Sequence, residues 1–235
     1  MVITAKSGNG EKMHIYLDGE YVATTNVNFW YSRNFTDGCQ IDEDEWQVLL
    51  HDIFFDKLYR SALGLLTIRE HSRSEVKDKL IKKLMHSDKS NRHKFESQTP
   101  DMNTLRTIAD EVCDFLEARN LLSDNRFAHD YAEELVRRKH MSVKRLYSAL
   151  KMKGIPPDIV DSVIKDLNVD DRESIRILLN TKYKNRDLSN QSDFDKTFSA
   201  LARAGFLYSD IKAEIYDVFF PNPFESGEIY IDDIL

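Results

Sequence analysis

The stretch SALKMKGI at residues 148–155 recurs with changes as SALARAGF at residues 199–206, an offset of 51 residues. In each copy an amphipathic segment ends at a glycine, Gly154 or Gly205, which suits the left-handed conformation that closes many helices. In the first copy the glycine is followed by Pro156 and Pro157, and the first turn of a helix makes no use of the N–H groups that proline lacks. The pattern predicts helix, tight turn and helix, repeated along the chain.

An earlier copy with the same plan starts near Ser74, which we expect to cap a helix with Val76, Leu80 and Leu84 on its apolar face. This copy lacks the glycine. The polar stretch HSDKSNRHKFESQTPDMN at residues 86–103 comes before helical spacing resumes near Thr104. We interpret that stretch as an exposed and mobile insertion in the first repeat.

Helical spacing of apolar residues continues from Asp52 to about Phe220 and predicts three helices in each repeat. A unit of about 50 residues has little core of its own, and stacked repeats share buried faces. The predicted architecture is therefore mainly α: three tandem three-helix repeats forming an elongated curved rod. The predicted segments are residues 52–120, 121–169 and 170–220 for the repeats, and residues 221–235 for an acidic tail.

The β structure is expected only in residues 1–51, as a small antiparallel sheet with a short helix. Asp18-Gly19 lies between the runs Met13–Leu17 and Glu20–Ala23, and this dipeptide between such runs indicates a hairpin. Val2–Ala5 supplies a third strand. Helical spacing starts at Asp42, where four consecutive acids precede apolar residues.

Composition excludes several classes of protein. The chain has 235 residues, of which 41% are hydrophobic and 31% charged, so it can bury a core. No apolar run is long enough to cross a bilayer or to serve as a signal peptide, which predicts a cytoplasmic protein without membrane association. Cys39 and Cys113 lie far apart without CxxC spacing, which excludes a disulfide framework and a zinc ribbon. We expect a monomer.

Catalytic motifs are absent from the sequence. The acids of residues 42–45 suit the first turn of a helix, where they complement the helix dipole. No histidine pair has HExxH spacing, and the chain has no GxSxG, no P-loop and no GxGxxG after a strand. The sequence predicts a protein that is not an enzyme and that needs no cofactor and no metal.

The predicted helix, turn and helix at residues 143–167 also has the plan of a helix-turn-helix motif, whose second helix reads bases in the major groove of DNA. Its second helix presents Asp158, Asp161 and Asp166, and the matching helix of the last repeat presents Asp210, Glu214 and Asp217. Acids facing a polyanion disfavour base reading by these helices.

The segment between Leu135 and Gly154 carries seven cations and no acid. Such a run repels itself unless an anionic group lies nearby, which favours a binding surface over a merely solvated helix face. Its partner could be phosphates, the acidic surface of another protein, or both. Only Tyr147 could stack on a base, and it could equally be a core residue, so backbone or protein contact is favoured. The candidate residues are Arg137, Arg138, Lys139, Lys144, Arg145, Lys151 and Lys153.

A weaker excess of cations runs from Arg73 to Lys94. From the sequence, a solvated helix face and a binding surface explain it equally well.

Three segments together resemble the RecX family, the regulators of the RecA recombinase. Residues 61–76 are similar to the opening motif of the family, residues 121–131 to its segment with the pattern G-x-L-D-D-x-R-F-A-x-x-Y, and residues 145–155 to R-I-x-x-x-L-x-x-K-G-I. The β-hairpin resembles the N-terminal extension of Gram-positive members. The chain departs from the pattern at Ser142, where glycine is usual, and in the first repeat, which lacks the Lys-Gly turn.

The resemblance implies a non-enzymatic protein of homologous recombination, DNA repair and the SOS response. Such a protein binds the RecA–DNA filament and modulates, usually inhibits, its ATP hydrolysis, strand exchange and coprotease activity. A curved rod would suit the groove of a helical filament. Two alternatives remain: a helical-repeat adaptor unrelated to RecA, and a weak DNA-binding protein.

The net charge of −7 is a sum over unlike regions. Residues 34–56 carry seven acids and no base, and residues 210–235 carry seven acids and one lysine, whereas the basic segment lies between them. This distribution argues against strong bulk attraction to free DNA and leaves a place in a protein–DNA assembly open.

Overall fold

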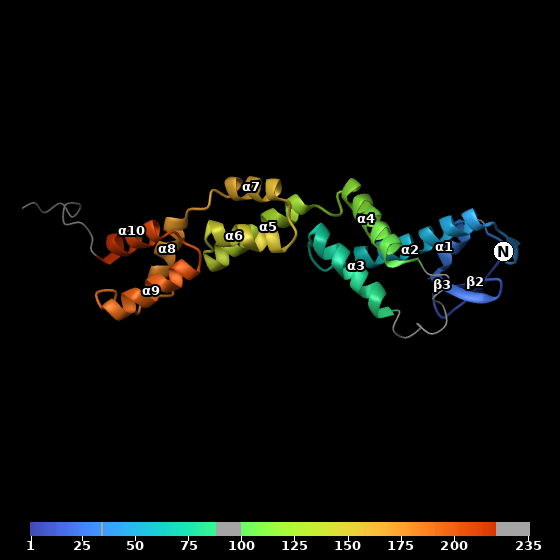
Figure 1. Cartoon of the computed structure of the whole chain (residues 1–235), viewed down its shortest axis with the longest axis horizontal. Coiled ribbons are helices and arrows are strands. Elements are labelled where there is room, and N and C mark those ends of the chain that lie inside the picture. Colours follow the sequence, from blue (N-terminus) through green and yellow to red (C-terminus); the bar gives the residue numbers. More distant parts are fainter. Residues whose placement is uncertain (34, 88–99, 220–235) are drawn as a thin grey trace, which may run out of the picture. The chain divides into compact units, whose positions relative to one another are not determined.

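The computed structural model describes residues 1–33, 35–87 and 100–219. Within these residues it contains ten α-helices and one four-stranded antiparallel sheet near the N-terminus (Figure 1). The predicted class, mainly α with a small N-terminal sheet, is confirmed. The chain divides into two compact units, Met1–Asp124 and Asn125–Leu235. Residues 88–99 of the predicted insertion and residues 220–235, which include the predicted tail, lie outside the described residues.

The sheet has the strand order β3-β2-β1-β4. Asp18 and Gly19 have φ angles of 49° and 85°, so the predicted hairpin turn has the two left-handed residues that favour Asp-Gly. The short helix expected in this segment was the one starting at Asp42, where α2 (Glu43–Leu66) begins. The last strand and helix α1 (Val27–Ser32) were not located from the sequence, because two and six residues are too short to show a period. The strands are β1 (Val2–Ser7), β2 (Lys12–Leu17), β3 (Glu20–Asn26) and β4 (Cys39–Gln40).

Helix α2 begins with a capping box. Asp42 Oδ1 accepts a hydrogen bond from the Glu45 amide at 2.8 Å, and Glu45 Oε2 accepts one from the Asp42 amide at 3.0 Å. The acids of this segment therefore serve the start of the helix, as expected. The helix continues without a break through residue 52, so the expected division between residues 51 and 52 falls inside it.

Helices α3 (Arg73–Ser87) and α4 (Met102–Ala118) complete the first unit. Ser72, and not Ser74, caps α3, because Ser72 Oγ accepts a hydrogen bond from the Glu75 amide at 3.1 Å. The predicted apolar stripe of α3 is confirmed, since its three members are at most 5% exposed. One core unites this stripe with the inner face of the sheet and with α2 and α4.

The second unit contains the six remaining helices. Gly154 and Gly205 have φ angles of 74° and 92°, which confirms the left-handed turns predicted after the two copies of the repeated stretch. The helices form two adjacent cores, one from α5 to α7 and one from α8 to α10. Their bounds are α5 (Asp124–Lys139), α6 (Val143–Met152), α7 (Pro157–Asp166), α8 (Asp171–Asn180), α9 (Gln191–Arg203) and α10 (Tyr208–Phe219).

The N-terminus of α6 is fixed to the last three helices. Ser142 is fully buried, its Oγ donates a hydrogen bond to the Ala204 carbonyl at 2.7 Å, and the Val143 amide donates one to Asp171 Oδ1 at 2.9 Å. Gly205 packs so closely that a Cβ there would lie 2.7 Å from Ser142 Oγ. We call these contacts the α6 joint.

A similar contact occurs at the start of α3, where the Arg73 amide donates to Asp124 Oδ1 at 2.7 Å. Burial raises the pKa of Asp124 and of Asp171, and in both cases the bond from the backbone amide opposes the rise. The same device, an aspartate at the first position of one helix that caps another helix, thus occurs twice in the chain.

His71 gives the first unit a pH dependence that can be tested. The side chain is 1% exposed, with Nδ1 2.9 Å from the Arg69 carbonyl and Nε2 2.6 Å from Lys79 Nζ. Burial lowers the pKa of His71, because the charged ring would lose its hydration. The neutral ring donates from Nδ1 and accepts the lysine proton at Nε2.

Acidification is therefore expected to destabilise the first unit through His71. The folded pKa lies below the unfolded value of about 6.5, so the contribution is complete above that value and is lost as the pH falls through the folded pKa. Urea unfolding at about pH 7.5 and about pH 5 measures the loss, which should be smaller in a His71→Gln variant. Equal pH dependence of the two proteins would contradict this role.

Candidate functional site

The structure places the seven candidate cations at the end of α5, along α6 and just after it. Six side chains are exposed, and Lys153 is half-buried with its Nζ 5.5 Å from the centre of the Tyr131 ring. We call this set the basic surface: Arg137, Arg138 and Lys139 in the last turn of α5, Lys144, Arg145 and Lys151 on α6, and Lys153 at its C-cap.

The three cations of α5 have a structural explanation. Cations in the last turn of a helix complement its dipole. Arg138 also pairs with Glu134 at 3.1 Å, although this pair is exposed and so contributes only about 0.3–0.5 kcal/mol. The neutralising acid lies one residue before the segment that the sequence analysis found free of acids.

Two of the three cations of α6 have no such explanation, whereas Lys151 lies in the last turn of α6 and complements its dipole. Lys144 and Arg145 lie in the first turn of the helix, where positive charge opposes the dipole, and this turn contains no acid. Lys144 and Lys151 are seven residues apart and so share a face of α6, about 10 Å apart along the axis. Among the described residues, no ion pair neutralises these three side chains. This unfavourable placement of charge favours a binding role for α6.

The weaker basic segment has a structural role instead. The guanidinium of Arg73 pairs with Asp114 and Glu117, each at 2.7 Å, and Lys77 pairs with Asp110 at 2.6 Å. These ion pairs join α3 to α4, so Arg73 and Lys77 have a structural role that neither interpretation described. Lys89, Arg92 and Lys94 lie outside the described residues.

The structure also shows where the residues considered for contact with nucleic-acid bases lie. Tyr147 is half-buried against the core of α5 to α7, and Asp158 and Asp161 are exposed on α7. Glu214 was expected on the outer face of α10, but it is 0% exposed and binds the guanidinium groups of two arginines of α8. Its role is to join α8 to α10, because a buried carboxylate requires paired cations.

Two exposed residues that the sequence pattern did not indicate lie next to the α6 joint. Leu207 and Tyr208 are 62% and 68% exposed and follow directly on the turn of Gly205, whose Cβ position lies 3.6 Å from Arg145 Cγ. Leu207 and Tyr208 follow the second copy of the repeated stretch, at the positions that Pro156 and Pro157 hold after the first copy. That replacement of two prolines by an apolar pair is a signal that the sequence comparison could have used.

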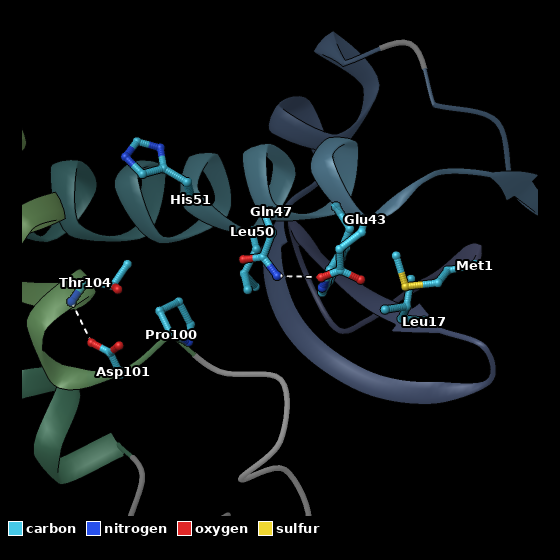
Figure 2. A pocket seen from close by; sticks show the side chains of 10 residues that line it. Met1, Leu17, Glu43, Gln47, Leu50, His51, Pro100, Asp101 and Thr104 are labelled. Carbon is cyan, nitrogen blue, oxygen red and sulfur yellow. Dashed lines mark hydrogen bonds between the residues drawn. The ribbon is translucent and has the colours of Figure 1, made fainter.

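A cavity of about 500 Å³ in the first unit offers a less favourable site (Figure 2). Gln47 Nε2 donates to Glu43 Oε1 at 2.8 Å, and Asp101 caps α4 by accepting from the Thr104 amide at 2.8 Å. His51 Nε2 lies 2.7 Å from Glu111 Oε2. These polar groups of the cavity thus already bind one another, a helix end or a carboxylate of α4.

Within residues 1–33, 35–87 and 100–219, no group of three or more potential ligands could hold a metal ion. No helix in the described part of the chain is long and apolar enough to cross a membrane.

Comparison with known proteins places the basic surface in a recognised domain. The family model described as RecX, second three-helix domain, matches residues 123–164, which cover α5, α6 and most of α7. The regulatory protein RecX of Clostridium tetani is 24% identical over 216 residues, with 90% of each chain covered. That of Bacillus velezensis is 24% identical over 226 residues, which cover 95% of this chain and 79% of the relative.

Solved structures agree on the fold. A crystal structure of regulatory protein RecX superposes with a TM-score of 0.58 at 20% identity, over 90% of this chain and 97% of the other. The crystal structure of RecX from Lactobacillus salivarius gives a TM-score of 0.52 at 22% identity, over 71% of this chain and 97% of the other.

Proposed function

Because this chain belongs to the RecX family of regulatory proteins, we propose that it binds RecA–DNA filaments and inhibits the activities of RecA: ATP hydrolysis, strand exchange and coprotease action. The observation that carries the proposal is the exposed charge of Lys144, Arg145 and Lys151 on α6, which no ion pair in the described part of the chain neutralises and which lies inside the segment that the family model matches. Filaments offer two anionic surfaces to such a helix, the DNA phosphates and the acidic side chains of RecA.

The mode of action follows from binding without chemistry. A protein that binds the active filament and one that binds RecA in a less active state differ only in which state they stabilise. Inhibition then requires that the protein bind the less active state of RecA more tightly. The ratio of its affinities for the two states sets how far the population of RecA can shift. The basic surface supplies attraction to either state, and contacts specific to one of them supply the difference.

Titration against the DNA-dependent ATP hydrolysis of RecA from the same organism tests this function. We expect a saturable fall in the rate of hydrolysis as the protein is added, with weak binding to the same DNA in the absence of RecA. Binding to naked DNA with no effect on hydrolysis would favour an independent DNA-binding protein. No effect and no DNA binding would favour an adaptor with another protein partner.

A further inference from the structure

Leu207 and Tyr208 form an apolar step on the surface of the second unit. Both side chains are more than 60% exposed, whereas Phe206 just before them is 4% exposed and anchors the turn in the core of α8 to α10. The ring of Tyr208 packs against Phe198 with centroids 5.3 Å apart and an angle of 61°. An aromatic ring that is already held in place loses little conformational freedom when a partner covers it.

Cations border this step. The Cβ position of Gly205 lies 3.6 Å from Arg145 Cγ and 3.7 Å from Lys144 Cβ, so the start of α6 adjoins the turn that carries the apolar pair. Arg203 is exposed at the end of α9, two residues before Gly205. The step therefore has an apolar centre with cations at its edge.

Acids lie close to the same step. Asp210 is two residues after Tyr208, and Asp171 accepts the hydrogen bond from the Val143 amide beside Lys144. A nucleic acid would bring its phosphates to both signs of charge at once. Protein interfaces, in contrast, combine tyrosine and arginine anchors at an apolar centre with a polar edge of mixed charge. The chemistry of the step thus favours a protein partner over a polynucleotide.

We propose that Leu207 and Tyr208 form a protein-binding hot spot for an apolar side chain that is flanked by carboxylates on the partner. The carboxylates face the cations at the edge, which are Lys144, Arg145 and Arg203. This inference rests on the proposed function, under which the partner is a RecA protomer of the filament and not its DNA. The step then supplies contacts specific to RecA, and the remaining cations of the basic surface supply general attraction.

The test compares a Leu207→Ser/Tyr208→Ala variant with the wild-type protein and with Tyr31→Ala. Tyr31 is a matched control, since its side chain is 66% exposed and lies in the first unit. Affinity is measured for RecA filaments on a fluorescein-labelled single-stranded oligonucleotide and for the oligonucleotide alone. Loss of a hot spot should weaken filament binding by about 30-fold, with the dependence on salt unchanged because no charge is removed. A Tyr208→Ser variant provides a second, smaller change should the double variant fold poorly.

The outcomes are distinct. Weaker filament binding with unchanged binding to the oligonucleotide supports the hot spot. Wild-type affinity in both variants overturns it while the proposed function stands. A loss on the oligonucleotide alone overturns it in favour of base stacking on Tyr208. Failure of the wild-type protein to bind filaments overturns the proposed function, and the inference with it.

Discussion

Reversal of the three cations of α6 is expected to weaken filament binding at least about tenfold near 100 mM salt. In the variant Lys144→Glu/Arg145→Glu/Lys151→Glu, each lost phosphate contact should also lower the slope of log affinity against log salt by about one unit. Titration of filament binding and of ATP hydrolysis at several salt concentrations measures both quantities. Because the three side chains are exposed, the change should leave the fold intact.

The matched control makes the same charge change elsewhere in the second unit. Lys165, Lys184 and Lys196 are exposed and lie outside α5 and α6, so their reversal to glutamate alters the net charge equally. The control should keep most of its affinity, since bulk charge alone is not the proposed cause. Unchanged inhibition by the folded α6 variant would remove α6 from the site. An equal loss in the two variants would assign the effect to net charge.

Gly205→Ala is expected to destabilise the protein by about 2–4 kcal/mol. The residue has a φ angle of 92°, which disfavours any side chain, and its new Cβ would lie 2.7 Å from the buried Ser142 Oγ. Gly10→Ala is the matched control, because Gly10 has a φ angle of 71° and its Cβ position has no atom within 4 Å. That control carries the conformational cost alone, about 1–2 kcal/mol, and denaturant unfolding measures both changes.

A double variant isolates the α6 joint. Ser142→Ala removes the hydroxyl that would collide with the new methyl group, so Ser142→Ala/Gly205→Ala should cost less than the sum of the single changes. Strictly additive costs would mean that the hydroxyl and the glycine do not interact in the folded protein.

The parts of the fold that were predictable are those with local signals. Asp18-Gly19 specifies its hairpin through two left-handed residues, and the glycines of the repeated stretch do the same for two helix ends. Ser72 was missed because Ser74 also precedes the apolar stripe, and the choice depends on which hydroxyl reaches the Glu75 amide. A two-residue strand such as β4 has no period to detect.

For the candidate site, the sequence predicted only the number of cations in the segment and not their positions relative to the helix ends. The sequence predicts that the cations of α5 and α6 are numerous, but it does not separate those that complement a helix dipole from those that oppose one until the helix ends are known. The buried position of Glu214 depends on arginines 38 and 42 residues away, and the approach of Gly205 to Arg145 spans 60 residues. Such contacts between repeats have no local signal.

The α6 joint also determines where the chain can be cut. A fragment that ended after residue 169 would contain the whole segment that the family model matches, yet it would lack the acceptors of the Ser142 hydroxyl and the Val143 amide. Removal of α8 to α10 would leave both donors to water in place of fixed acceptors, so the first turn of α6, which carries Lys144 and Arg145, would lose the contacts that hold it in position. The smallest piece suited to binding studies therefore holds both three-helix groups, α5 to α7 and α8 to α10, and is larger than the segment that the family model matches.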